Sequence, residues 1–144
     1  MHQKISAERS EEVPRIIPGL CCLGAVVACL AYARYRAGMP DWWRGSGGGI
    51  PYVAFWAALG YSFFPRRRWL LAICTWAVVG TCGLEFLQLW KPEWLTQFRA
   101  TRFGAALLGS GFTWSDMPPY FIGGLIAYFV LAVTSRFSNT KRQL

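Results

Sequence analysis

The sequence predicts an all-α, polytopic membrane protein with four transmembrane helices. Two observations support this fold class: apolar segments of membrane length recur along the chain, and the basic residues gather at the ends of these segments. Roughly 20 apolar residues in a helix cross the hydrocarbon layer of a bilayer. The chain has 144 residues, of which 54% are hydrophobic, so it suits one compact unit. Four apolar segments in so short a chain are not a soluble core.

The predicted membrane domain, residues 16–134, contains four helices, over residues 16–33, 47–64, 69–90 and 117–134. The second helix has the weakest signal, because its apolar run 50–64 is short and begins beside Pro51. The glycines before this run can extend it to membrane length. Residues 1–15 and 135–144 are predicted to be tails outside the bilayer.

The connection between the third and fourth helices, residues 91–116, is too apolar for a solvated loop. It carries several aromatic and aliphatic side chains. Arg99 and Arg102 are three residues apart, so they can share one face of a helix. We therefore predict an interfacial or re-entrant amphipathic segment at the outer membrane surface.

Lysine and arginine residues predict the orientation, because short cytoplasmic loops carry an excess of both. With the N-terminus inside, nine of them lie in cytoplasmic segments and six in outer segments. The compact turn of Arg66, Arg67 and Arg68 contributes most, and these side chains can also contact anionic lipid head groups. Both termini are therefore predicted to be cytoplasmic. The net charge of +8 follows the membrane boundaries, which argues against a nucleic-acid partner.

Glu85 and Gln88 are the strongly polar side chains of the third apolar segment, and their spacing puts them on one helix face. A carboxylate in hydrocarbon costs several kcal/mol unless it is paired, protonated or in contact with water. Arg99 is the expected ion-pair partner, because arginine suits bidentate carboxylate pairing at low dielectric. Arg102 and Asp116 follow on the same side. We therefore predict a polar cluster near the outer leaflet.

Three roles remain open for this cluster. The Glu85–Arg99 pair can simply pin the re-entrant segment onto the bundle. The cluster can bind a polar or anionic head group. Alternatively, Glu85 and Asp116 can act as acid and base, which requires that their pKa values differ. Asp116, or Ser115 beside it, can also be the N-cap of the fourth helix, which opens with two prolines.

The remaining polar features indicate no chemistry. The glycine-rich run 45–49 lacks the lysine and the preceding strand of a phosphate-binding loop, so it predicts a flexible linker. The only histidine is His2, and the cysteines lie inside apolar runs. The sequence therefore predicts no metal site, no catalytic residue and no cofactor.

Several short motifs in the second half of the chain carry a resemblance: Glu85-x-x-Gln88, Arg99-Ala-Thr101, Gly104, Leu108-Gly109, Phe112-Thr-Trp-Ser-Asp116 and Tyr120-x-x-Gly123. Over about residues 69–132 this pattern resembles a small bacterial family of integral membrane proteins of unknown function. That family is similar in pattern to the VanZ-like proteins. The resemblance implies a four-helix protein of the bacterial inner membrane with no established catalytic activity.

The sequence thus predicts a small, non-enzymatic membrane protein that is an accessory or structural subunit of a larger membrane complex. Its expected partners are membrane lipids and that complex. One alternative is a cell-envelope protein that binds a lipid-linked head group, and the other is an intramembrane acid–base enzyme. The candidate residues for binding a ligand or partner are Glu85, Gln88, Arg99, Arg102, Asp116 and Tyr120.

Overall fold

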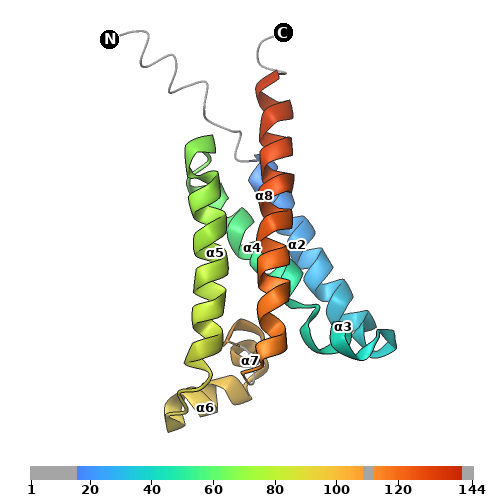
Figure 1. Cartoon of the computed structure of the whole chain (residues 1–144), viewed down its shortest axis with the longest axis vertical. Helices are drawn as coiled ribbons and strands as arrows, with labels where there is room; N and C mark the ends of the chain where they lie inside the picture. Colours follow the sequence, from blue (N-terminus) through green and yellow to red (C-terminus); the bar gives the residue numbers. More distant parts are fainter. Residues whose placement is uncertain (1–15, 109–111, 141–144) are drawn as a thin grey trace.

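The structure is a computed structural model that describes residues 16–108 and 112–140 (Figure 1). These residues form an all-helical fold, as predicted. The longer helices are α2 (Ile16–Tyr35), α4 (Gly49–Phe63), α5 (Arg67–Leu87) and α8 (Met117–Thr140). The shorter elements between them are η1 (Arg36–Gly38), α3 (Asp41–Ser46), α6 (Glu93–Ala100), α7 (Arg102–Leu108) and η2 (Trp114–Asp116).

The four longer helices run alternately in opposite directions (Figure 1). The start of α2, the connection between α4 and α5, and the later part of α8 lie at one end of the bundle. The short helices α3, α6 and α7 lie at the other end. Helix α4 is central, because it packs against α2, α5 and α8, while α5 also packs against α8. The basic turn therefore lies at the opposite end from α6 and α7.

Three helices in the described part of the chain are long and apolar enough to cross a membrane, over Ile16–Gly38, Arg67–Leu87 and Trp114–Arg136. Their outward faces remain apolar, as Leu23, Trp76 and Phe129 illustrate, each more than half exposed. Helix α4, the predicted second span, has only 15 residues. At 1.5 Å per residue it covers about 22 Å, which is less than the roughly 30 Å of bilayer hydrocarbon.

Prolines and caps explain where the helices begin and end. Pro51 lies in the first turn of α4, where a missing N–H costs nothing. Phe64 leaves the helix because it precedes Pro65, whose ring disfavours helical backbone in the residue before it. Thr101 is the N-cap of α7, since its Oγ1 accepts a hydrogen bond from the Gly104 N–H at 3.0 Å. Local sequence therefore sets the short length of α4.

The glycine-rich run 45–49 is a packed turn and not the flexible linker that its composition predicts. A Cβ atom on Gly48 would lie 2.7 Å from the ring of Tyr32, and one on Gly49 would lie 2.7 Å from the ring of Tyr120. The chain thus passes between two tyrosine rings where only glycine fits. This packing brings the start of α4 directly against the start of α8.

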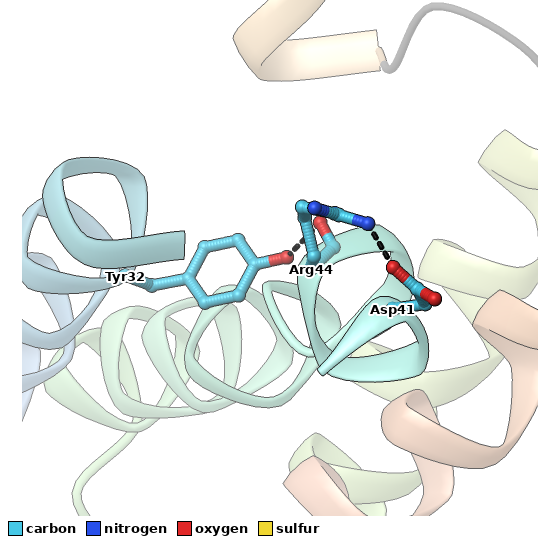
Figure 2. Close-up of polar contacts among 3 residues, drawn as sticks. All are labelled: Tyr32, Asp41 and Arg44. Atoms are coloured by element: carbon cyan, nitrogen blue, oxygen red, sulfur yellow. Dashed lines mark hydrogen bonds and ion pairs between the residues drawn. The ribbon is translucent and has the colours of Figure 1, made fainter. Parts of the chain in front are cut away.

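Tyr32 holds α3 in place (Figure 2). Its hydroxyl lies 2.8 Å from the carbonyl oxygens of both Trp43 and Arg44, which share its single proton. These carbonyls belong to the last turn of α3, and the Trp43 oxygen also accepts the backbone N–H of Gly47 at 2.9 Å. Arg44 also forms an ion pair with Asp41 on the exposed side of α3. An exposed pair of this kind contributes at most about 1 kcal/mol.

The apolar core lies toward the basic end of the bundle. It is formed by pairs of side chains from three helices, Ala57 and Tyr61 of α4, Leu70 and Cys74 of α5, and Ala127 and Leu131 of α8. Near the other end, Gly123 of α8 packs against the backbone of Ile50, as its small size predicts. The polar residues are therefore left at the end that carries the short helices.

We expect Gly123→Ala to destabilise the bundle. The added Cβ would lie 2.6 Å from the carbonyl oxygen and 2.9 Å from the Cα of Ile50, so α4 would have to move. Overpacking of this kind costs about 1–3 kcal/mol. The measurement is the thermal unfolding midpoint in detergent. The control is Gly83→Ala on α5, where nothing lies within 4 Å; equal midpoints for the two variants would contradict the close approach of α4 and α8.

Candidate functional site

A partly open cavity of about 280 Å³ lies at the end of the bundle that carries the short helices. Its wall is formed by α3, α4, α5 and α7 together with the start of α8. One water molecule needs only about 10–15 Å³ of such space, so the cavity has room for a larger group. Its polar lining residues are Ser46, Tyr52, Thr81, Glu85, Gln88, Asp116 and Tyr120.

Glu85 and Tyr120 join α5 to α8 across this cavity. Their side chains are 5% and 7% exposed, and the Tyr120 hydroxyl donates a hydrogen bond to Glu85 Oε1. A buried carboxylate without partners is strongly unfavourable. A hydrogen bond to a charged group contributes about 1.5–3 kcal/mol. The tyrosine therefore offsets part of the cost of placing Glu85 in the bundle.

Two acceptor oxygens of the cavity wall have no hydrogen-bond partner among the described residues. They are Glu85 Oε2 and Gln88 Oε1. Gln88 is 3% exposed, so its oxygen is as well hidden as that of Glu85. A buried acceptor without a donor costs about 1–3 kcal/mol, and native structures contain few of them. Both side chains line the cavity, so a donor group in that space would lie next to them.

Asp116 does not have the geometry of an N-cap, contrary to one of the roles expected from the sequence. It directly precedes α8, and a cap side chain accepts a hydrogen bond from the N–H of the second or third helical residue. These residues are Pro118 and Pro119, which have no N–H. The half-buried Asp116 instead lines the cavity, within electrostatic range of Glu85.

The expected Glu85–Arg99 ion pair is not formed, although both residues lie in the described part of the chain. Arg99 donates to the carbonyl oxygens of Leu87 at 3.1 Å and Trp90 at 3.3 Å. Helix α5 ends at Leu87, before the predicted residue 90. In the turn that follows, the Leu87 carbonyl also accepts the Trp90 N–H at 3.1 Å. Arg99 is thus a second donor to the Leu87 carbonyl, and its positive charge suits the negative end of the helix dipole. The pairing prediction was therefore wrong.

The structure places the other predicted basic residues away from the cavity. Arg102 is exposed at the start of α7 and does not line the wall. Arg66, Arg67 and Arg68 lie at the far end of the bundle, where the Arg68 guanidinium is 5.6 Å from the centre of the Trp69 ring. Of the predicted site residues, the cavity thus brings together Glu85, Gln88, Asp116 and Tyr120.

Three polar lining residues were missed by the sequence reasoning. Thr81 lies four residues before Glu85 on the same face of α5, and that spacing is a usable signal. Tyr52 donates its hydroxyl to the Leu107 carbonyl at 2.6 Å, and Ser46 donates to Ser115 Oγ at 3.1 Å. Neither of these two contacts could be predicted, because each depends on how the glycine turn packs.

The lining residues give the cavity an acceptor-rich, acidic character. Glu85 and Asp116 supply carboxylates, and the described wall includes no lysine or arginine. Within residues 16–108 and 112–140, no group of three or more His, Cys, Asp or Glu side chains is arranged to hold a metal ion. The wall can therefore accept hydrogen bonds and attract positive charge.

We expect Glu85 and Tyr120 to be energetically coupled. Tyr120→Phe removes the donor and Glu85→Gln removes the charge, so the double variant should lose less stability than the sum of the single losses. The expected coupling is about 0.5–3 kcal/mol, measured by a double-mutant cycle on unfolding in detergent. The control cycle combines Glu85→Gln with Arg99→Ala, which share no contact. Coupling as large in the control cycle as in the Glu85–Tyr120 cycle would contradict this assignment.

One comparison with known proteins identifies a family. Residues 38–124 match the family described as protein of unknown function (DUF2809). The matched stretch runs from η1 to the first turns of α8, and it contains every residue that lines the cavity. It begins earlier than the region 69–132 in which the sequence motifs suggested an uncharacterised membrane family. No solved structure matches the chain. Because the match covers more than half of its residues, the chain belongs to the DUF2809 family of proteins of unknown function.

Proposed function

We propose that this protein is a four-pass membrane protein whose cavity binds the polar group of a membrane-associated ligand, such as a lipid-linked head group. The observation that supports this function best is the pair of buried, unpartnered oxygens on Glu85 and Gln88. Two unsatisfied acceptors are costly in a bundle that only has to be stable. They are useful if a ligand supplies the missing donors.

The depth of Glu85 along α5 supports a ligand at the membrane interface. Eighteen residues separate it from Arg67, which corresponds to about 27 Å of helix. Bilayer hydrocarbon is about 30 Å thick. If the basic turn lies at one boundary, the carboxylate lies just inside the other. A head group can reach that level without crossing the hydrocarbon.

The shortness of α4 fits a fourth pass completed by a re-entrant segment. Helix α4 packs against α2, α5 and α8, so little of it needs to face lipid. Before α4 begins, the chain turns through the glycine run. The Tyr52 hydroxyl of α4 donates a hydrogen bond to the Leu107 carbonyl of α7 and so links the two helices. Non-helical backbone at membrane depth is tolerated where protein or a wet cavity surrounds it. Helix α7 and η2 would supply these surroundings.

We expect both termini and the basic turn to be cytoplasmic, because positively charged loops are retained inside. The measurement is labelling of single cysteines in intact cells with a membrane-impermeant reagent, in a cysteine-free background. Thr96→Cys, on exposed α6, should be labelled from outside, whereas Arg68→Cys, also exposed, should be labelled only after the cells are opened. The reverse labelling pattern would overturn the orientation.

We expect the purified protein to retain a bound small molecule that depends on Glu85. The measurement is native purification followed by mass spectrometry of what co-purifies. Glu85→Gln should retain at least about tenfold less, because a hydrogen bond to a charged group of about 1.5 kcal/mol corresponds to that factor. The matched control is Glu93→Gln, the same change on exposed α6. Equal retention in both variants would remove the cavity as the binding site.

The accessory-subunit role is the second candidate, and one surface favours it. An apolar groove of about 610 Å³ runs between α4 and α5, lined in part by Gly60, Trp76 and Gly80. Nothing lies within 4 Å of a Cβ built on Gly80 or Gly83, so these small residues are not used within the bundle. Small residues on an apolar helix face allow close approach of a second helix. A stoichiometric protein partner in the same purification would favour this role.

A further inference from the structure

The side-chain donors of the cavity are already used. Each of its four hydroxyl groups donates within the protein: Ser46 to Ser115, Tyr52 to the Leu107 carbonyl, Thr81 to the Ala77 carbonyl, and Tyr120 to Glu85. The Gln88 amide and the backbone N–H of Thr113 both lie close to the Glu85 carboxylate. The cavity therefore offers few side-chain donors to a ligand.

The acceptors of the cavity, in contrast, remain available. Glu85 Oε2 and Gln88 Oε1 are buried without a partner, and the half-buried Asp116 carboxylate lines the same space. The first two side chains are 5% and 3% exposed, so solvent competes weakly for them. Three side chains that carry acceptor oxygens thus line one cavity. The ligand group that complements them must donate hydrogen bonds.

The charge of the wall restricts this donor further. Glu85 and Asp116 are both acidic, and no lysine or arginine occurs among the described lining residues. Arg99, the arginine predicted to pair with Glu85, donates instead to the carbonyls of Leu87 and Trp90. An anionic group would lack a counter-charge here. A cationic donor would have two, and charge-assisted hydrogen bonds are the strong ones.

We propose that this cavity binds a primary ammonium group, with Glu85, Gln88 and Asp116 as its acceptors. This inference rests on the proposed function and names the ligand chemistry of the same site. A primary ammonium is compact and carries three donors, which equals the number of acceptor groups. It can come from the head group of an aminophospholipid or from a soluble amine.

The test uses the full chain in phosphatidylcholine nanodiscs, whose choline groups carry no N–H donor. In one arm ethanolamine is titrated from solution and its binding is measured by calorimetry. In the other arm phosphatidylethanolamine replaces part of the phosphatidylcholine, and native mass spectrometry measures the bound lipid. Binding only of the dissolved amine indicates a soluble source. Selective retention of phosphatidylethanolamine indicates the lipid. Either result supports the ammonium site.

The variants then locate the binding. Glu85→Gln and Asp116→Asn should each weaken binding at least about tenfold, whereas Glu93→Gln should leave it unchanged. Asp116→Asn should also keep the thermal unfolding midpoint of the wild type, since Pro118 and Pro119 leave this side chain no N–H to cap. Its loss of binding would therefore not reflect loss of the fold.

Several results would overturn the inference. Tetramethylammonium, which cannot donate, should not compete; equal competition would mean that charge alone is recognised. Saturation by Ca²⁺ in place of the amine, or failure of both amine arms, would also exclude an ammonium site. If a phosphate- or sugar-bearing lipid is retained instead and is lost in Glu85→Gln, the ammonium fails and the proposed function stands. If nothing distinguishes Glu85→Gln from Glu93→Gln, both fail.

Discussion

Glu85 places a carboxylate inside an apolar bundle, and the Tyr120 hydroxyl partly offsets the cost of burying it. This hydrogen bond links α5 to α8 near the end that carries the short helices. It needs the Tyr120 ring at a fixed height, and the ring is held there because Gly49 has no side chain to displace it. The position of the carboxylate thus depends on a contact among α4, α5 and α8.

The two ends of the bundle differ in their packing. Toward the basic turn, three helices pack an apolar core around Tyr61 and Leu131. Toward the other end, α4 begins late, and its short length leaves a space that the glycine turn, α7 and η2 only partly fill. The cavity is this remaining space.

Arg99 and Asp116 differ from the predictions because the ends of helices α5 and α8 determine which groups these charged side chains can contact. Arg99 was expected to neutralise Glu85, but its guanidinium donates to the carbonyls of Leu87 and Trp90, at the end of α5 and in the turn after it. Asp116 was expected to be able to cap α8, but two prolines remove the N–H groups that a cap requires. As a result the cation is kept out of the cavity wall and the anion is kept in it, which gives the site its acidic character.

The sequence by itself determined the helical class, the apolar segments, the polar face of Glu85 and Gln88, and the nearness of Asp116 to the start of α8. These features depend on composition and on spacing within one helix, which are local. Only the tertiary structure decided that Tyr120 and not Arg99 binds Glu85, and that the glycine run is packed. Both outcomes depend on which helices contact each other and on which of their residues lie at the same level along the bundle axis. That information is carried by contacts between residues far apart in the chain, and hydropathy and periodicity do not record it.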